Sequence, residues 1–292
     1  MADDSPLKDA QTYCADLVRR FDRDRYICAL LSPDHVRPHL MALYAFNIEI
    51  AITSETVSNP LIGQMRLKWW HDALDDISRG HPPAHQVALP LSVTVRQTRL
   101  PQELLAGMIS ARLEDFAESP PETLTELTSY ADRTAGTLAE LSMMAMGHSE
   151  NSGGVTMHQM GTAYALTGLI RALPFARPGQ RIFLPTDLCQ QENFNITDLN
   201  GLLSRQSASP ELCHVLCRVA DHAETLVAAV CQAQTSIPSQ VMAVLLPAAL
   251  TRRQLSRLKL CGHDPFRLKM AETGPNPGDM LRLAWARFRR RI

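Results

Sequence analysis

Apolar residues recur with helical spacing along most of this chain. In residues 37–52 (RPHLMALYAFNIEIAI), steps of three and four place Leu40, Leu43 and Tyr44 on one face of a helix. Strand-like segments are scarce, and the best candidate, residues 181–184 (RIFL), is only four residues long. The pattern therefore predicts an all-α protein.

Clear breaks separate the helical segments, but none of them is typical of a linker between domains. The strongest are 147–154 (GHSENSGG) and 176–180 (ARPGQ). A length of 292 residues is compatible with two domains of about 150 residues each. Because the loops are short and no repeat or low-complexity segment is present, we expect one α domain over residues 20–272. An N-terminal extension or helix (1–19) precedes it, and a basic helix (273–292) follows it.

Charge is distributed unevenly along a chain that is almost neutral as a whole. Twenty-nine Lys and Arg against 30 Asp and Glu give a net charge of -1, which argues against a nucleic-acid binder. Residues 251–292 carry 11 Lys and Arg but only 3 Asp and Glu, a net charge of +8, so the rest carries -9.

The last eleven residues (RLAWARFRRRI) place aromatic side chains at helical spacing among arginines. This pattern is typical of a helix that lies on an anionic membrane surface or an acidic partner. The alternative is a packed terminal helix whose arginines complement its C-terminal dipole. The residues predicted to form such a surface are Trp285, Arg287, Phe288, Arg289, Arg290 and Arg291.

Neither a membrane span nor a targeting segment is recognisable in the sequence. The longest apolar run, 241–250, is half the length that a bilayer-spanning helix needs and contains Pro247. The first residues (MADDSPLKDAQ) are acidic, unlike secretory signals or mitochondrial transit peptides. Seven cysteines, an odd number, indicate free thiols in a reducing compartment. We expect a cytoplasmic protein of bacterial type, peripheral on the inner face of the cytoplasmic membrane if the basic helix binds lipid.

Two clusters carry residues suited to metal chemistry. Asp72, Asp75 and Asp76 share a predicted helical face, and paired carboxylates can hold Mg²⁺ against a diphosphate. The alternative is a solvent-exposed acidic face behind an apolar stripe. Cys213 and Cys217 are four residues apart, but no second ligand pair accompanies them, so buried apolar thiols are expected there. The sequence predicts no metal site.

Three segments, taken in order, resemble signatures of the squalene/phytoene synthase family. They are 26–46 (YICALLSPDHVRPHLMALYAF), 130–136 (YADRTAG) and 161–185 (GTAYALTGLIRALPFARPGQRIFLP), and the resemblance covers roughly residues 20–250. It implies a single-domain, isoprenoid-synthase-like helical bundle around a central apolar cavity. In that family two aspartate-rich motifs face each other across the cavity. They hold Mg²⁺, which neutralises the diphosphate that leaves an allylic isoprenoid.

This chain departs from the family at the acidic positions. Ala51 and Glu55 stand where the first motif has its acids, and Ala172 and Ala176 stand where the second has them. The Ser-rich segment that contacts phosphate in the family corresponds to 22–25 (DRDR). The resemblance therefore implies no confident catalytic residue and no Mg²⁺ cluster of the usual kind.

Other strings resemble one branch of the family, the mitochondrial complex I assembly factors with a squalene/phytoene-synthase-like domain. The strings are 45–51 (AFNIEIA), 63–70 (GQMRLKWW), 169–175 (LIRALPF) and 183–189 (FLPTDLC). That branch shares the loss of the acidic motifs and acts in early assembly at the matrix face of the inner membrane. The resemblance implies a respiratory complex subunit as a partner.

Three functional hypotheses follow. The first is a non-catalytic protein that assists assembly of respiratory complex I or binds an apolar isoprenoid or lipid ligand. The second is a prenyl transferase of squalene/phytoene synthase type with a degenerate Mg²⁺-diphosphate site, and only this hypothesis requires a cofactor. The third is an isoprenoid or lipid carrier that kept the cavity without the chemistry. The candidate ligand-binding residues are Tyr44, Glu55, Arg66, Tyr130 and Arg171.

Overall fold

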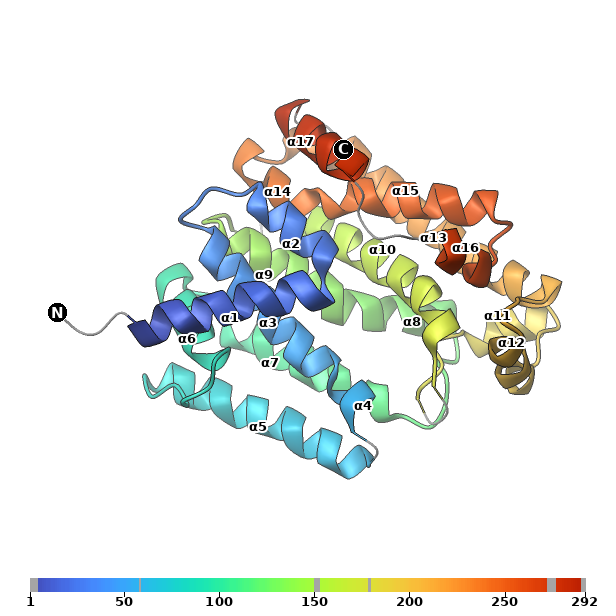
Figure 1. The fold of residues 1–292 in the computed structure, drawn as a ribbon, viewed down its shortest axis with the longest axis horizontal. Coiled ribbons are helices and arrows are strands. Elements are labelled where there is room, and N and C mark those ends of the chain that lie inside the picture. The colour runs from blue at the N-terminus through green and yellow to red at the C-terminus, as the bar shows by residue number, and fades with distance from the viewer. Residues whose placement is uncertain (1–4, 58, 150–152, 178–179, 272–276, 290–292) are drawn as a thin grey trace.

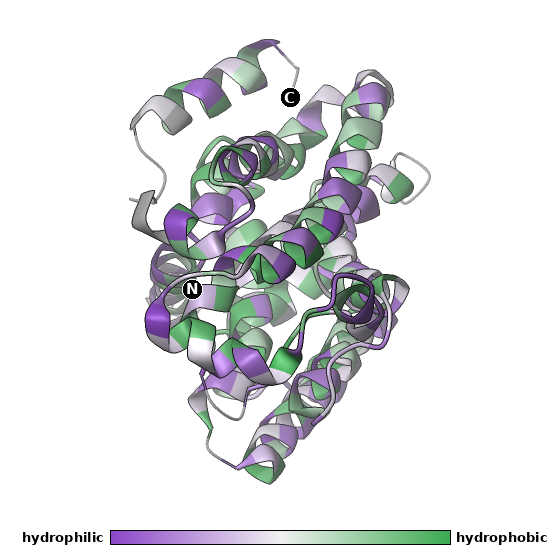
Figure 2. Ribbon diagram, turned by 90° about the vertical axis from the view of Figure 1, so that its right-hand side faces the viewer, coloured by the Kyte–Doolittle hydropathy of each residue, from purple (hydrophilic) through white to green (hydrophobic). Residues whose placement is uncertain are grey.

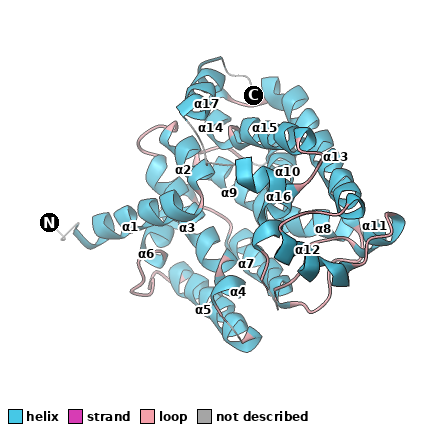
Figure 3. Cartoon of the chain, turned by 45° about the vertical axis from the view of Figure 1, so that its right-hand side comes forward, coloured by secondary structure: helices cyan, strands magenta, loops and turns pink. Residues whose placement is uncertain are grey.

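The structure is a computed structural model that describes residues 5–57, 59–149, 153–177, 180–271 and 277–289. Every regular element in these ranges is a helix (Figure 1; Figure 3). The prediction of an all-α fold is confirmed. Residues 181–184, the best strand candidate, form an irregular connection.

The first half of the chain packs around α3 (Arg37–Ala51). This helix is buried along most of its length because apolar residues cover nearly all of its faces. Helices α1, α6 and α9 pack against it. The other elements of this half are α1 (Ser5–Phe21), α2 (Arg23–Leu30), α4 (Thr53–Thr56), α5 (Pro60–Ser78), α6 (Ala88–Thr98), α7 (Gln102–Ala111), η1 (Arg112–Phe116), α8 (Leu124–Ala131), η2 (Asp132–Gly136) and α9 (Thr137–Ala145).

The second half packs around α10 (Gly154–Ala172), which contacts α13, α15, α9 and α8. A second hydrophobic core lies between α8, α10, α13 and α15, while the first core also includes Met157 and Met160 of α10 and residues of the segment 230–248. The other elements are η4 (Leu173–Phe175), α11 (Thr186–Gln191), η5 (Ile196–Asp198), α12 (Leu199–Arg205), α13 (Pro210–Ala233), η6 (Gln234–Ser236), η7 (Ser239–Val241), α14 (Met242–Leu245), α15 (Pro247–Leu260), α16 (Pro265–Ala271) and α17 (Pro277–Arg289).

Local signals in the sequence explain where α8 begins. Thr123 is its N-cap, and the hydroxyl of Thr123 accepts a hydrogen bond from the backbone N–H of Glu126 at 3.1 Å. The carboxylate of Glu126 in turn accepts a bond from the backbone N–H of Glu122 at 2.7 Å. This reciprocal capping fixes the start of the helix that carries Tyr130.

The π-helix η2 lies in close contact with α10. A Cβ atom added at Gly161 of α10 would lie 2.1 Å from the backbone oxygen of Ala135, so only glycine allows this approach. The contact joins the segments 130–136 and 161–185, and it explains in physical terms why a glycine stands at the start of the second one.

His158 of α10 connects the same elements through two carboxylates. Its Nδ1 lies 2.7 Å from Asp132 of η2, and its Nε2 lies 3.0 Å from Glu140 of α9. The bond to Asp132 raises the pKa of His158 to about 9, although partial burial opposes the shift. The imidazole is therefore charged at neutral pH and links three elements of the bundle.

We expect this link to make stability depend on pH. Folding raises the pKa of His158, so the stabilisation is complete below about pH 6.5 and is lost as the pH rises through about 9. His158→Gln should lower the free energy of unfolding at pH 6 by about 1–3 kcal/mol. Chemical denaturation from pH 6 to 9.5 should show the two proteins converging at the alkaline end. A constant difference across that range would contradict a charged His158.

Candidate functional site

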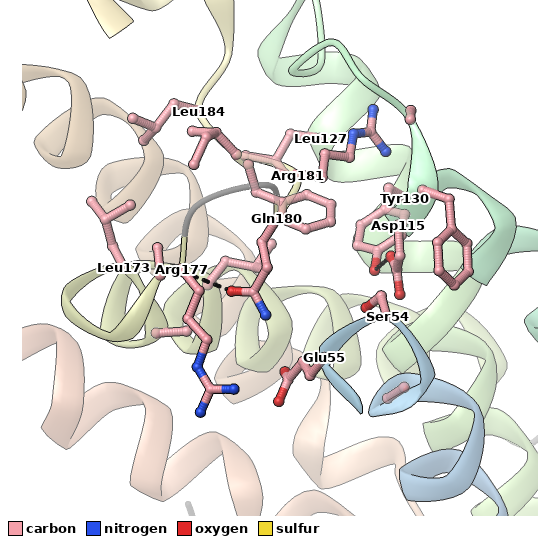
Figure 4. A pocket seen from close by; sticks show the side chains of 18 of the residues that line it. Ser54, Glu55, Asp115, Leu127, Tyr130, Leu173, Arg177, Gln180, Arg181 and Leu184 are labelled. Carbon is pink, nitrogen blue, oxygen red and sulfur yellow. Dashed lines mark hydrogen bonds between the residues drawn. The ribbon is translucent and has the colours of Figure 1, made fainter. Parts of the chain in front are cut away.

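A cavity of about 430 Å³ lies where helices of the two halves meet (Figure 4). Its volume is in the range of sites that bind small apolar molecules. Helices α3, α4, α8, α10 and α13 contribute to its wall, together with η1, η4 and the connection after η4. The apolar part of the wall is formed by Leu127, Leu166, Leu169, Ile170, Leu173, Ile182, Phe183, Leu184, Leu216 and Val219.

A buried polar cluster forms another part of the wall. The hydroxyl of Tyr130 donates a short hydrogen bond to the carboxylate of Asp115, and Nη1 of Arg112 donates to the same hydroxyl at 2.7 Å. Arg112 and Asp115 lie 3.6 Å apart. The ring of Tyr130 stacks on Phe183 with 4.8 Å between ring centres. The cluster thus joins η1 to α8 and to the connection after η4.

Burial controls the protonation of this cluster. It raises the pKa of Asp115, although the guanidinium of Arg112 acts in the opposite direction. It also raises the pKa of Tyr130 far above the usual value, so the phenol stays protonated. A protonated phenol that is engaged with a carboxylate and a guanidinium is a structural link and a poor proton acceptor.

Arg181 fixes the connection that closes the cavity. Its Nη1 donates to the backbone oxygen of Glu114 at 2.9 Å, and its Nε donates to that of Ser119 at 3.2 Å. The guanidinium also lies 3.4 Å from the carboxylate of Glu114. The charge of Arg181 is thus already engaged by the protein.

The structure brings all four altered acidic positions to the cavity. Ala51 and Glu55 lie near the end of α3 and on α4, and Ala172 and Ala176 lie at the end of α10 and just after η4. The arrangement expected from the family is retained, but three of the four side chains end in methyl groups.

These residues do not fit the magnesium site that the family implies. Mg²⁺ requires oxygen ligands in near-octahedral geometry, usually carboxylates together with phosphate and water. Glu55 is the one carboxylate at the four positions, and Asp115, nearby in the wall, is engaged by Tyr130 and Arg112. In the described part of the chain, no group of three or more His, Cys, Asp or Glu could hold a metal ion.

The predicted ligand-binding residues divide into two sets. Glu55 and Tyr130 line the cavity. Tyr44 is instead buried in the first core. Arg66 is exposed on α5, where its Nη1 donates to the Thr56 hydroxyl at 3.1 Å. Arg171 follows Ile170 and precedes Ala172, which both line the cavity. Its own guanidinium instead lies 3.8 Å from the carboxylate of Asp24.

The segment 22–25 forms a second buried polar cluster. Arg25 forms an ion pair with Asp22 at 2.7 Å and lies 4.4 Å from the ring centre of Tyr164. Tyr164 donates to Asp22 at 3.2 Å, and Asp24 accepts a bond of 3.2 Å from the side chain of Gln254. These contacts use carboxylates and an arginine where the family has a serine-rich phosphate contact.

The acidic cluster on α5 lies away from the cavity. Asp72 pairs with Lys68 at 3.0 Å, and Asp76 pairs with Arg79 at 2.8 Å. Asp75 accepts a hydrogen bond from Gln102. The structure confirms a solvent-facing acidic surface here. The other interpretation of these residues, a Mg²⁺ site for a diphosphate, is wrong for this cavity, because none of the three carboxylates lines it.

The paired cysteines of α13 lie on its partly exposed side. Burial raises the pKa of Cys213 and of Cys217 above the usual value, and Cys217 donates a weak bond to Asp221 at 3.7 Å. All seven cysteines of the chain are free thiols, three of them buried and four half-buried.

The predicted C-terminal surface is only partly as expected. Trp285, Phe288 and Arg289 are exposed on α17. Arg287 turns inward instead, because its Nη1 donates to the backbone oxygen of Ser239 at 2.9 Å. Arg290 and Arg291 lie outside the described residues.

Sequence reasoning missed Arg112, Asp115 and Arg181 as residues of the site. Arg112 and Asp115 are three residues apart, which is a common spacing for a pair on a helix. No local signal shows that this pair meets Tyr130, because that contact depends on how η1 packs against α8.

Comparison with known proteins gives the same family that the sequence resembles. A family model described as squalene/phytoene synthase matches residues 18–278. NADH dehydrogenase (ubiquinone) complex I, assembly factor 6, of Bos taurus is 28% identical over 254 residues, which cover 87% of this chain and 75% of the bovine protein. A phytoene synthase of Arthrospira platensis is 26% identical over 210 residues, which cover 66% of this chain and 67% of that protein.

The fold also matches solved structures. A dehydrosqualene synthase in complex with a ligand has a TM-score of 0.83 to this chain at 18% sequence identity, with 98% of each chain covered. This confirms the predicted isoprenoid-synthase-like bundle. Together with the family match over most of its length, it shows that the chain belongs to the squalene/phytoene synthase family.

Proposed function

We propose that this protein is a non-catalytic member of its family that acts in the assembly of respiratory complex I. The proposal that the protein is non-catalytic rests on the residues of the cavity wall. Ala51, Ala172 and Ala176 occupy positions that face the cavity and present methyl groups instead of metal ligands.

The charge of the wall supports the same conclusion. Among the described lining residues, Arg112, Arg177 and Arg181 are balanced by three carboxylates, Glu55, Asp115 and Glu118. A departing diphosphate carries several negative charges that must be neutralised as its bond breaks. This wall offers no excess of positive charge for that purpose.

The segment 22–25, which stands where the family contacts phosphate, also argues against diphosphate binding. Asp22 and Asp24 place two carboxylates beside Arg25 and Arg171. Arg171 is thereby directed to a protein carboxylate, and an incoming diphosphate would meet repulsion from Asp24.

An assembly role is supported by the likeness to proteins named complex I assembly factor 6. It is also supported by an exposed apolar stripe on α5, which is the kind of surface that proteins use to bind partners. The exposed fractions are 60% for Leu61, 48% for Ile62, 64% for Met65 and 40% for Trp69. Part of this stripe belongs to the string 63–70 that resembles the assembly-factor branch.

Binding of an apolar ligand is a second candidate function, and the cavity volume favours it. The space of about 430 Å³ is walled largely by leucines from α8, α10 and α13. Loss of the metal ligands does not remove this apolar volume, so an isoprenoid or lipid tail remains a suitable occupant.

The absence of prenyl transfer is directly testable. Purified protein with Mg²⁺ and farnesyl or geranylgeranyl diphosphate should release pyrophosphate no faster than buffer, and Glu55→Gln should behave identically. The phytoene synthase of Arthrospira platensis, assayed in parallel, serves as the active control. Sustained release that Glu55→Gln abolishes would instead establish the prenyl transferase alternative.

The assembly role is tested in the organism that encodes the protein. Deleting the gene should lower the amount of assembled complex I on native gels severalfold and leave its subunit transcripts unchanged. Re-expression of the wild-type chain and of Glu55→Gln should both restore the complex, because the proposed role does not use the remaining acid. Normal complex I in the deletion strain would contradict the proposal.

Ligand binding is tested by native mass spectrometry of protein purified from its own host. We expect a non-covalent adduct of a few hundred daltons, the size of one lipid or isoprenoid. Ala172→Trp should reduce it, because Ala172 lines the cavity yet is solvent-exposed and tolerates a larger side chain. If the wild-type protein and Ala172→Trp both show only the mass of the polypeptide, the result would count against a ligand.

A further inference from the structure

We propose that the outward face of α17 docks this protein on an anionic membrane surface. The outward face consists of Leu281, Trp285 and Phe288, with Arg282 and Arg289 beside them. The proposal is independent of the assembly role, because it rests on this helix alone.

One side of α17 holds the helix to the body of the protein. Leu283 is 1% exposed and packs in a small core with Ile27, Cys28, Leu246 and Leu250. Arg287 adds a hydrogen bond of 2.9 Å from its Nη1 to the backbone oxygen of Ser239. Because these contacts fix the rotation of the helix, they also determine which residues face outward.

The opposite side is apolar and uncovered. Leu281 is 73% exposed, Trp285 58% and Phe288 79%. At 3.6 residues per turn these three side chains fall within an arc of about 60°, opposite Leu283. The rings of Trp285 and Phe288 lie side by side with 5.9 Å between their centres.

Positive charge lies next to this apolar arc. Arg282 and Arg289 project on the side of the helix next to Trp285, and the guanidinium of Arg289 lies 5.0 Å from the Trp285 ring centre. The surrounding segment 251–292 carries a net charge of +8, whereas the rest of the chain carries -9. The positive charge is thus concentrated at the end of the chain that carries the exposed aromatic residues.

An anionic lipid surface fits this combination best. Aromatic side chains enter the headgroup region while neighbouring arginines bind lipid phosphates. Helix α17 lies at one end of the molecule (Figure 1) and carries both hydrophobic and hydrophilic residues (Figure 2), so it can meet a flat surface without a receiving groove. No described helix is long and apolar enough to cross a bilayer.

The exposed stripe on α5 provides a matched comparison. Leu61 and Met65 are about as exposed as the residues on α17. Nearby charges there are mixed, because Lys68 pairs with Asp72. The pair Leu61→Ala and Met65→Ala therefore removes exposed apolar surface without touching the basic helix.

The test is co-sedimentation of the full chain with vesicles of phosphatidylcholine alone or of phosphatidylcholine with about one-third phosphatidylglycerol, whose anionic headgroups give the surface a negative potential. The wild-type chain should bind only the anionic vesicles, and binding should weaken steeply between low and high salt. Arg282→Gln with Arg289→Gln should weaken binding about 25-fold. Trp285→Ala with Phe288→Ala should weaken it at least about tenfold, and the α5 pair should leave it unchanged. Thermal unfolding of each variant confirms that it is folded.

Several outcomes would overturn the proposal. The wild-type chain does not bind anionic vesicles, it binds neutral vesicles equally well, or the α5 variant loses as much vesicle binding as the α17 variants. A further outcome is that the wild-type chain binds no vesicles while the α17 variants fail to support complex I assembly. This result would assign the face to an acidic protein partner and would likewise refute membrane docking.

Discussion

Buried charges in this protein are neutralised by other side chains of the same chain. Asp115 is balanced by Arg112, Arg25 by Asp22, and the half-buried His158 by Asp132 and Glu140. Leaving Asp115 or Arg25 unpaired in the interior would be costly, because removing one member of a buried pair destabilises a protein by about 3–5 kcal/mol. Further side chains connect these pairs to neighbouring elements: Tyr130 of α8 bonds to the pair in η1, Tyr164 of α10 bonds to Asp22, and His158 joins α10 to η2 and α9. The arrangement of the bundle around the cavity therefore depends on them.

This internal balance explains how the fold persists without the acidic motifs. A cluster of aspartates around a cavity is stable only when cations are present to offset their repulsion. Replacing three of the four positions with alanine removes the repulsion, and the cavity can then be maintained by leucine packing and by the Arg112–Asp115–Tyr130 cluster. The fold and the cavity are therefore separable from the metal chemistry that the family performs.

The sequence predicted the features that depend on local pattern. Helical spacing identified the all-α fold, and the signature segments placed Ala51, Glu55, Ala172 and Ala176 around one cavity. The contacts of Arg171 and Asp24, 147 positions apart, were beyond prediction because they depend on the packing of α2 against its neighbours. The inward turn of Arg287 was missed for a similar reason. Helical spacing gives the relative directions of side chains but not which direction meets the body of the protein.

The magnesium dependence of isoprenyl diphosphate binding tests the loss of the metal site most directly. Calorimetry of farnesyl diphosphate binding, with and without Mg²⁺, should give the same weak or absent affinity for this protein. The triple substitution Ala51→Asp, Ala172→Asp and Ala176→Asp should introduce magnesium-dependent binding, since it returns carboxylates to the cavity wall. Tight binding by the unaltered protein that appears only when Mg²⁺ is added would contradict the conclusion that its cavity has lost the metal site.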